Sequence, residues 1–511
     1  MDAIKIHTRC WITIALLLFC WVWPGLAAES TTLTILHTND THGRLLPFNY
    51  PDDVMPASRL AGLPERRDIG GIARRATLVR QIRAARQQRD ATPVILVDAG
   101  DFSDGTPFST EYHGEADIAA MNAVGYDFAT LGNHEFNYSL AHTRKLMALA
   151  RYPVLCANAI DRATGRPFTT PYAIRSFGPL KVALFGLVTP SAANYPGGRE
   201  GVAIADPLAT AGRMATELRA QADLVILLSH CGDEIDQRIA SRVEDIDVIV
   251  GGHSHSRLPT GKFVWHSAEL KADDVNGTII VQNHQWGGEL GRLDMLFVRD
   301  EVGAWRVDRY RAQLLPITAA IPEDSAVAAV VAHFWQPIAP RYGEVIGQAE
   351  ADFVTRQGDL AEYNLMADAI RATFKTDFVL ENIGGVRAPL VRGTITRADL
   401  VAMDPFDDTI VTFTISGKDL KQLLRQRQPA VSGVRYRIAG SDLAEATCGG
   451  RSLSDQRIYT GAVNSFIARR WLKNRVVQDT GRRRLDVLVD YIRERGRIAP
   501  AYDGRRVIVA P

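Results

Sequence analysis

Polar side chains that can bind a metal ion follow five short apolar runs of this sequence. They are aspartate, histidine and asparagine, whose oxygen and nitrogen atoms suit divalent cations such as Zn²⁺, Mn²⁺, Mg²⁺ and Co²⁺. The residues concerned are Asp40, His42, Asp101, Asn133, His230, His253 and His255. One such group after one run carries little information, but the whole set is typical of a site for two metal ions.

The elements that must position these groups are strands. With the polar groups that end them, the runs span residues 33–42, 94–101, 128–135, 224–230 and 248–255. Apolar runs of this length, bounded by glycine, predict strands that are buried on both faces. Helical patterns at residues 73–87, 115–124, 139–150 and 206–221 alternate with them. The alternation predicts α/β layers, and such sheets bind ligands at the carboxyl ends of their strands.

Two metal ions about 3.5–4 Å apart can hold both the attacking and the leaving oxygen of an in-line displacement. Such a pair needs a bridging carboxylate, and Asp101 is the best candidate because it stands alone in a Gly-Asp turn. Asp40 and His42 are spaced i and i+2, as are His253 and His255. On an extended strand this spacing would direct both side chains of each pair to the same side.

The chain divides into four predicted parts. Residues 1–28 carry basic residues, then an apolar stretch and small residues, which predicts a cleaved export signal, with an uncleaved anchor as the alternative. Residues 30–315 hold the candidate ligands, residues 316–342 are proline-punctuated and mostly helical, and residues 343–511 form a second α/β pattern. We therefore expect an exported protein, periplasmic or secreted, with two domains joined by a linker helix and no stable membrane anchor.

Net charge and cysteine content argue against a protein that binds nucleic acid or membranes and against a disulfide-rich protein. The net charge of +1 provides no large field to attract a nucleic acid polymer or a membrane. Without the predicted signal, Cys156, Cys231 and Cys448 remain, which is too few for a disulfide framework. At most one pair could form, and the sequence does not indicate which. Cys231 is not expected to bind metal beside His230, because neighbouring side chains point to opposite sides of an extended strand.

The motifs that surround the candidate ligands resemble the calcineurin-like metallophosphoesterases. In the second domain, residues 382–387 (NIGGVR) and 393–396 (GTIT) add a resemblance to the secreted 5′-nucleotidase branch, which includes UDP-sugar hydrolases and 2′,3′-cyclic-nucleotide phosphodiesterases. The motifs in the first domain are residues 38–43 (TNDTHG), 100–101 (GD), 132–136 (GNHEF) and 252–255 (GHSH). The resemblance implies an α/β sandwich of two mixed sheets flanked by helices, followed by a smaller α/β domain that binds the substrate.

The resemblance also implies a division of the ligands between two ions. One ion would be bound by Asp40, His42, Asp101 and His255, and the other by Asp101, Asn133, His230 and His253. A metal-activated water would attack phosphorus. His134 would face the phosphate rather than a metal ion, and would stabilise the transition state or protonate the leaving group.

Asn137 departs from the pattern of the nucleotidases, which have an aspartate three residues after the catalytic histidine. Asparagine can orient the imidazole of His134, but it supplies no negative charge to raise the pKa. Cyclic-nucleotide phosphodiesterase relatives are similar to this chain at this position. The sequence therefore predicts a less basic His134 and favours cyclic esters as substrates.

The second domain supplies candidate substrate contacts. The resemblance places Asn382, Gly384 and Arg387 in a turn against the ligand, where glycine allows close approach and the guanidinium suits phosphate. Arg356 is a weaker candidate for binding phosphate, because the following segment is spaced differently from the family pattern. Phe406 and Phe466 match the two rings between which nucleotidases bind the base.

The acidic residue that should bind ribose after Phe466 is missing, and the sequence there continues with Arg469, Arg470 and Trp471. The leading hypothesis is a two-metal hydrolase of small phosphoesters such as nucleotides, in which His134 and Asn137 are catalytic. One alternative is a hydrolase of a non-nucleotide phosphate or sulfur ester. A second alternative is a metal-containing binding protein with little turnover.

Overall fold

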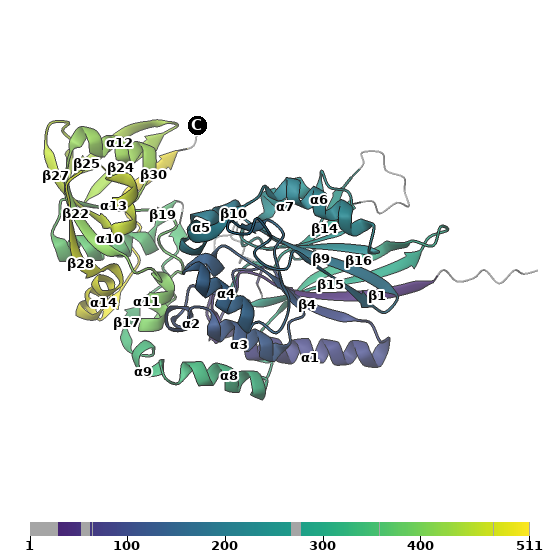
Figure 1. Cartoon of the computed structure of the whole chain (residues 1–511). Helices are drawn as coiled ribbons and strands as arrows, with labels where there is room; N and C mark the ends of the chain where they lie inside the picture. Colours follow the sequence, from purple (N-terminus) through teal and green to yellow (C-terminus); the bar gives the residue numbers. More distant parts are fainter. Residues whose placement is uncertain are drawn as a thin grey trace, which may run out of the picture.

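The computed structural model describes residues 29–52, 62–63, 65–266, 277–356, 358–473 and 475–509. Two α/β bodies lie at opposite ends of the molecule, and helices α8 and α9 run along one side between them (Figure 1). The predicted export signal lies outside the described residues, as does part of the loop at residues 49–67. Within the described part of the chain, no helix has the length and apolar character that crossing a membrane requires.

The first domain contains two six-stranded mixed sheets. One sheet has the order β16 (Trp305–Pro316), β15 (Glu289–Arg299), β1 (Ser30–Thr38), β4 (Val94–Asp98), β5 (Phe128–Thr130) and β6 (Val154–Leu155). The other has the order β13 (Lys262–Trp265), β14 (Gly277–Val281), β12 (Val248–Gly251), β11 (Leu224–His230), β9 (Leu180–Val188) and β8 (Tyr172–Phe177). Strands β1, β4, β5 and β6 are parallel, as are β9, β11, β12 and β14.

Alternating side chains explain why the strand runs are continuously apolar. In β1, Leu33 and Ile35 face the other sheet, whereas Leu36 packs against the helices. In β11, Ile226 faces the core between the sheets, whereas Val225 faces the helix layer on the opposite side. Both faces are therefore buried, and the prediction of an α/β sandwich with two mixed sheets is confirmed.

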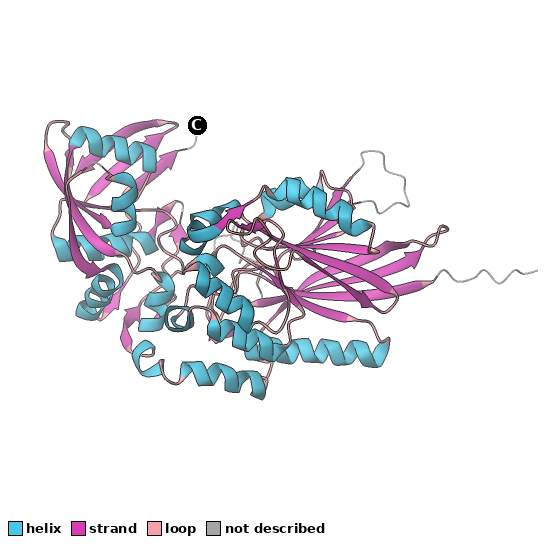
Figure 2. Cartoon of the chain, viewed as in Figure 1, coloured by secondary structure: helices cyan, strands magenta, loops and turns pink. Residues whose placement is uncertain are grey.

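Helices cover the outer face of each sheet (Figure 2). The first sheet is covered by α1 (Ile72–Arg89), α3 (Glu115–Val124), α4 (Leu140–Leu149) and α8 (Ser325–Trp335), and the second by α6 (Pro207–Arg219) and α7 (Asp233–Ala240). The predicted helices at residues 73–87, 115–124, 139–150 and 206–221 match α1, α3, α4 and α6. Helix α6 begins where Asp206 accepts a hydrogen bond from the Ala209 amide and Pro207 fixes the first turn.

Short elements complete this domain and lead to the second. They are β2 (Pro47–Phe48), β3 (Ile69–Gly70), α2 (Pro107–Tyr112), β7 (Ala159–Asp161), α5 (Pro196–Gly201), β10 (Val202–Ile204) and α9 (Ala339–Tyr342). Val327 and Val331 of α8 belong to the apolar core beneath α1 and α3, so α8 packs on the first domain. The boundary of the linker at residues 316–342 stays a prediction.

The second domain is built around a five-stranded sheet, β23 (Ala430–Ser432), β20 (Phe378–Glu381), β27 (Ile458–Asn464), β22 (Thr409–Ser416) and β28 (Val477–Arg483). Helices α10 (Ala361–Phe374) and α14 (Arg484–Arg495) cover one face, and α12 (Gly417–Arg427) and α13 (Ser465–Trp471) cover the other. Further elements are α11 (Arg397–Met403), β17 (Val345–Ala349), β18 (Thr355–Arg356), β19 (Asp359–Leu360), β21 (Gly393–Thr396), β24 (Val434–Ala439), β25 (Asp442–Cys448), β26 (Arg451–Ser452), β29 (Arg497–Ile498) and β30 (Arg506–Val509).

Candidate metal centre

All seven candidate ligands lie in or directly after the carboxyl ends of β1, β4, β5, β11 and β12. Asp40, Asp101, Asn133 and His230 are at most 2% exposed, so their polar groups face protein rather than solvent. His42 is also buried, whereas His253 and His255 are partly exposed. Polar groups at this depth require partners, and the geometry shows that they are largely each other's partners.

One cluster consists of Asp40, His42 and His255. The Nε2 atom of His255 lies 3.3 Å from Oδ1 of Asp40, and the Nε2 atoms of His42 and His255 are 3.2 Å apart. Nδ1 of His42 lies 3.1 Å from the carbonyl oxygen of Asp104, which directs Nε2 toward the cluster. Burial lowers the pKa of His42 to about 3, so its imidazole is neutral, as metal binding requires.

A second cluster consists of Asp101, His230 and His253. Oδ2 of Asp101 lies 3.0 Å from Nε2 of His230, and Oδ1 of Asp40 lies 4.0 Å from the same atom. Burial alone would lower the pKa of His230, but Asp101 raises it to about 10. The negative charge that favours a proton on this nitrogen would equally favour a divalent cation, because both are positive charges at the same position.

Asn133 offers an oxygen to the second cluster. Its Nδ2 atom donates to the hydroxyl of Tyr195 at 2.9 Å, whereas its Oδ1 atom is buried and has no hydrogen-bond partner among the described residues. A buried acceptor without a partner is unfavourable unless a cation or a water satisfies it. The donor set of carboxylate, imidazole and amide oxygen therefore fits divalent metal ions.

The backbone of the ligand loops corrects one prediction. Strand β1 ends at Thr38 and β12 ends at Gly251, so the i and i+2 pairs do not lie on extended strands. Instead, five ligands adopt left-handed backbone conformations, with φ of 49° at Asp40 and His42, 54° at Asp101, 70° at His253 and 51° at His255. Such residues cost roughly 1–3 kcal/mol each and cluster at functional sites. The pairs converge because of these turns, not because of strand alternation.

Glu135 supports the loops, although the sequence indicated no role for it. Its Oε2 atom accepts hydrogen bonds from the amides of Asp101 at 3.0 Å and Gly132 at 2.7 Å. A side chain at Gly132 would collide with Oδ1 of Asp101, so only glycine fits there. Tyr195 was also missed, and nothing near it in the sequence indicates a contact with Asn133.

His134 lies beside both clusters and forms a third group with His42 and Asp101, and its Nε2 atom lies 3.9 Å from Oδ2 of Asp101. Its Nδ1 atom lies 2.7 Å from Oδ2 of Asp104. The prediction that Asn137 is the partner of this imidazole is therefore wrong, because the side chain of Asn137 instead hydrogen-bonds the carboxylate of Asp104. Burial lowers the pKa of His134, but Asp101 and Asp104 outweigh it and the pKa is raised, so the predicted loss of basicity is also wrong.

From the second domain, Arg387 reaches the first domain directly. Its Nη2 atom lies 3.4 Å from Nε2 of His134. Asn382 accepts a hydrogen bond from Asn464 at 3.2 Å, and Gly384 has a φ of 91° and donates its amide to Tyr363. The turn at residues 382–387 thus places its arginine opposite the catalytic histidine candidate.

The remaining substrate candidates have other neighbours. Arg356 is exposed on β18, and its guanidinium lies over the ring of Tyr502 at 4.8 Å. Phe406 and Phe466 are both partly exposed, and the guanidinium of Arg470 covers the ring of Phe466 at 4.0 Å. One face of the second predicted ring therefore already carries a cation, which the sequence did not indicate.

A buried ion network holds the substrate segments in place. Arg484 is 1% exposed and donates to Glu381 at 2.9 Å, to Asp404 and to the carbonyl of Gly385 at 2.8 Å. These acceptors lie within two positions of Asn382, Phe406 and Arg387 respectively. A single side chain on α14 therefore contacts both segments, which the Arg387 amide and the Met403 carbonyl also join at 2.9 Å.

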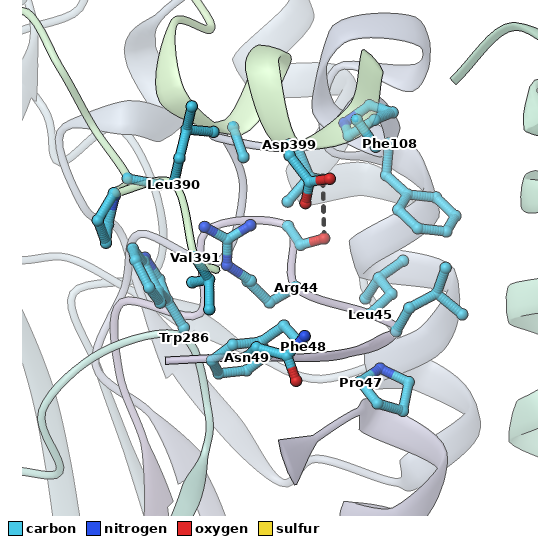
Figure 3. Close-up of a pocket in the computed structure, with 18 of the residues that line it drawn as sticks. Arg44, Leu45, Pro47, Phe48, Asn49, Phe108, Trp286, Leu390, Val391 and Asp399 are labelled. Carbon is cyan, nitrogen blue, oxygen red and sulfur yellow. Dashed lines mark hydrogen bonds between the residues drawn. The ribbon is translucent and has the colours of Figure 1, made fainter. Parts of the chain in front are cut away.

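A cavity of about 420 Å³ lies between the domains, beside the metal centre. Its walls come from residues 43–49 and 106–108, from Trp286 and Trp335, and from residues 388–402. Arg44 projects into it and stacks on Trp286 at 4.1 Å, and Asp399 lines the wall on α11 (Figure 3). The lining includes none of the seven ligand candidates, so this cavity adjoins the metal centre without being part of it.

Comparison with known proteins identifies the family. Residues 33–257 match the calcineurin-like phosphoesterase family, and residues 345–473 match the 5′-nucleotidase C-terminal domain. A 5′-nucleotidase of Vibrio cholerae is 30% identical over 497 residues, covering 86% of this chain and 85% of the relative. A snake venom 5′-nucleotidase of Gloydius brevicauda is 29% identical and covers 95% and 90%.

A solved structure agrees with these similarities in sequence. The 5′-nucleotidase precursor from Thermus thermophilus superposes with a TM-score of 0.79 at 28% identity, covering 94% of this chain and 99% of the other. The shared fold, the two matched domains and the clustered histidines and aspartates all lead to one conclusion. This chain belongs to the 5′-nucleotidase family of metal-dependent phosphoesterases.

Proposed function

We propose that this protein is an exported hydrolase of nucleotide phosphoesters that uses two divalent metal ions. The observation that carries the proposal is the meeting of three groups: two adjacent His/Asp clusters and the His134–Arg387 contact between the domains. Asp40, His42, Asp101 and His255 would hold one ion, and Asp101, Asn133, His230 and His253 the other. Bound ions would supply Lewis-acid polarisation of the phosphoryl group and an activated water.

The chain's own residues bind and orient the substrate. Arg387 would provide a planar donor for two phosphate oxygens, and its position 3.4 Å from Nε2 of His134 supports a phosphoryl site that both side chains face. His134 then donates a proton to the leaving oxygen as the bond to phosphorus breaks. His134 is buried at this contact, and low exposure to solvent strengthens the electrostatic interactions of its imidazole.

Nucleoside 5′-monophosphates are the first substrate candidates, in agreement with the names of the relatives. The structure removes one of the two reasons for preferring 2′,3′-cyclic nucleotides, because His134 has a carboxylate partner after all. The second reason remains, since no acidic residue follows Phe466. Cyclic nucleotides are therefore the second candidates.

The test is a screen of purified protein against AMP, 2′,3′-cyclic AMP, UDP-glucose and p-nitrophenyl phosphate, each with Mn²⁺, Zn²⁺, Mg²⁺ or Co²⁺. We expect hydrolysis of a nucleotide that chelation abolishes and one of these ions restores. Activity on the aryl phosphate alone would indicate a non-nucleotide ester as substrate. Absence of turnover with every ion, in protein that binds metal, would support the binding-protein alternative.

A further inference from the structure

The orientation of His134 depends on what holds its Nδ1 atom. Nε2 faces Arg387 and the metal centre, at 3.4 Å and 3.9 Å from Arg387 and Asp101. An imidazole that must present one nitrogen to a substrate needs a partner at the other, because that partner sets both the ring orientation and the position of the protons. In this chain the group at Nδ1 is Asp104.

Asp104 is built into the site from both its side chain and its backbone. Its carboxylate lies 2.7 Å from Nδ1 of His134, and its carbonyl oxygen lies 3.1 Å from Nδ1 of His42. The same residue therefore orients a candidate metal ligand and the candidate catalytic imidazole. Its amide donates to the hydroxyl of Ser109 at 2.8 Å, which anchors the turn at the start of α2.

The backbone of Asp104 is strained, and its side chain is mostly buried. Its φ is 75°, a left-handed conformation that side chains other than glycine rarely adopt, and its side chain is only 15% exposed. Strained residues persist where the surrounding structure holds them, and they cluster at active sites. The contact with His134 gives this strain a function.

Asn137 occupies the position where the resemblance to nucleotidases predicts the carboxylate. Its side chain donates to Asp104 instead of reaching the imidazole. Carboxylate and amide have thus exchanged places: the acid comes from the loop after β4, and the amide follows the histidine by three residues.

We infer that Asp104 is the positioning residue of His134, supplying from the loop after β4 the carboxylate that relatives carry three residues after the histidine. This inference rests on the proposed function and deepens it. With its carboxylate 2.7 Å from Nδ1, Asp104 holds the ring so that Nε2, with the proton it donates, faces the leaving oxygen. As water adds to phosphorus and the bond to the leaving oxygen breaks, that oxygen takes the Nε2 proton, and a proton from the water restores the imidazole.

The first variant is Asp104→Gly. Glycine accepts a φ of 75° and keeps the carbonyl near His42, so the change removes only the carboxylate. We expect kcat for AMP to fall roughly 10- to 100-fold, the scale for loss of a group that orients an active-site ligand, with KM nearly unchanged. The fall should be smaller for p-nitrophenyl phosphate, whose leaving group needs little protonation.

Asp68→Gly is the matched control, because Asp68 also has a left-handed backbone, with φ of 49°, but lies at the surface in an ion pair with Arg74. It should leave kcat unchanged. The exchange variant Asp104→Asn/Asn137→Asp should recover most of the lost activity, since the carboxylate returns to the position of the relatives. Unchanged kcat in Asp104→Gly, or no recovery in the exchange variant, would overturn the inference.

Two readouts separate this inference from the proposed function. The imidazole N–H proton of His134 should give a downfield NMR signal in the wild type that is lost in both His134→Ala and Asp104→Gly, whether or not any substrate is turned over. Metal content should stay at the wild-type level in Asp104→Gly. Loss of an ion would make Asp104 a support for His42 rather than for His134, and a persistent signal would also contradict the inference.

Discussion

The metal centre of the first domain and the substrate segments of the second are held in place by different means. Each candidate ligand of the centre follows a buried strand or ends one, and left-handed turns direct five of the seven toward their neighbours. The segments around Asn382, Phe406 and Arg387 depend instead on Arg484, a residue far along the chain. Backbone turns orient the ligands of the first site, whereas in the second Arg484 is the charged side chain that contacts both segments, alongside the hydrogen bond from the Arg387 amide to the Met403 carbonyl at 2.9 Å.

Removing Asp101 tests the metal centre of the first domain and should have the largest effect on activity. Its carboxylate lies next to His230 and accepts the amide of His134 at 2.8 Å, so it connects both clusters. Asp101→Ala should lower kcat/KM by roughly 10⁴-fold or more and reduce bound metal, because both ions lose a ligand. Activity and metal analysis of folded protein would check this, with the exposed Asp90→Ala as control. Near-normal turnover would show that the centre does not use two bridged ions.

Removing Arg484 tests the support of the substrate segments in the second domain. Arg484→Met leaves Glu381 and Asp404 buried without a counter-ion, and breaking such a network typically costs about 3–5 kcal/mol of unfolding free energy. Because both substrate segments lose their common donor, KM for nucleotides should rise while bound metal stays constant. Denaturant unfolding and kinetics would measure the two effects. A destabilised variant with wild-type KM would show that the network holds the fold but not the binding segments.

The aromatic rings provide a finer comparison inside the second domain. Phe406→Ala should raise KM for AMP by about 5- to 150-fold, the equivalent of roughly 1–3 kcal/mol of base stacking. Phe466→Ala should have a smaller effect, because Arg470 already covers one face of this ring and the ring packs partly on the domain core. KM for p-nitrophenyl phosphate is the internal control and should stay constant. Equal losses on both substrates would indicate that the domain is misfolded.

The difference between the two regions also explains what the sequence could predict. Apolar runs with a polar end fix both the strand and the place of its ligand, so Asp40, Asp101 and His230 could be found from local patterns. The helices α1, α3, α4 and α6 followed from their apolar periodicity in the same way.

Contacts between distant segments could not be predicted in this way. Asp104 lies 30 positions before its partner His134, and no local pattern relates the two, although an Asp-Gly turn near a ligand was a usable signal. Arg484 directly follows Arg482 and Arg483 in the sequence, yet it is buried against acids about 80 and 100 positions earlier. Pairing of buried charges depends on the tertiary fold, which the periodicity of a single sequence does not encode.

The two domains also differ in how their buried acids are paired, and this difference should have the smallest effect on the protein, a change in Tm. Asp117 on α3 is 1% exposed and so buried like Glu381 and Asp404, but it lacks their ion pair with an arginine: neither of its carboxyl oxygens has a hydrogen-bond partner among the described residues. Burial raises the pKa of Asp117 well above its ordinary value, so the folded state holds a proton that the unfolded state releases. Its contribution to stability is therefore complete below about pH 4 and declines as the pH rises toward the folded pKa.

Asp117→Asn should remove this decline, so the variant should gain Tm relative to the wild type at about pH 8 and gain little at about pH 4. Asp324, which caps α8, is the control of opposite sign: hydrogen bonds from the Val327 and Ala326 amides and the charge of Arg80 lower its pKa. Its stabilisation is present at neutral pH and lost in acid, so Asp324→Asn should lose Tm at about pH 7 but not at about pH 3. Thermal unfolding across this pH range checks both signs. If the Tm difference for Asp117→Asn did not grow with pH, the pKa of this carboxyl would not be raised in the folded state. Asp117 would then have a stabilising partner, as Glu381 and Asp404 do in the second domain.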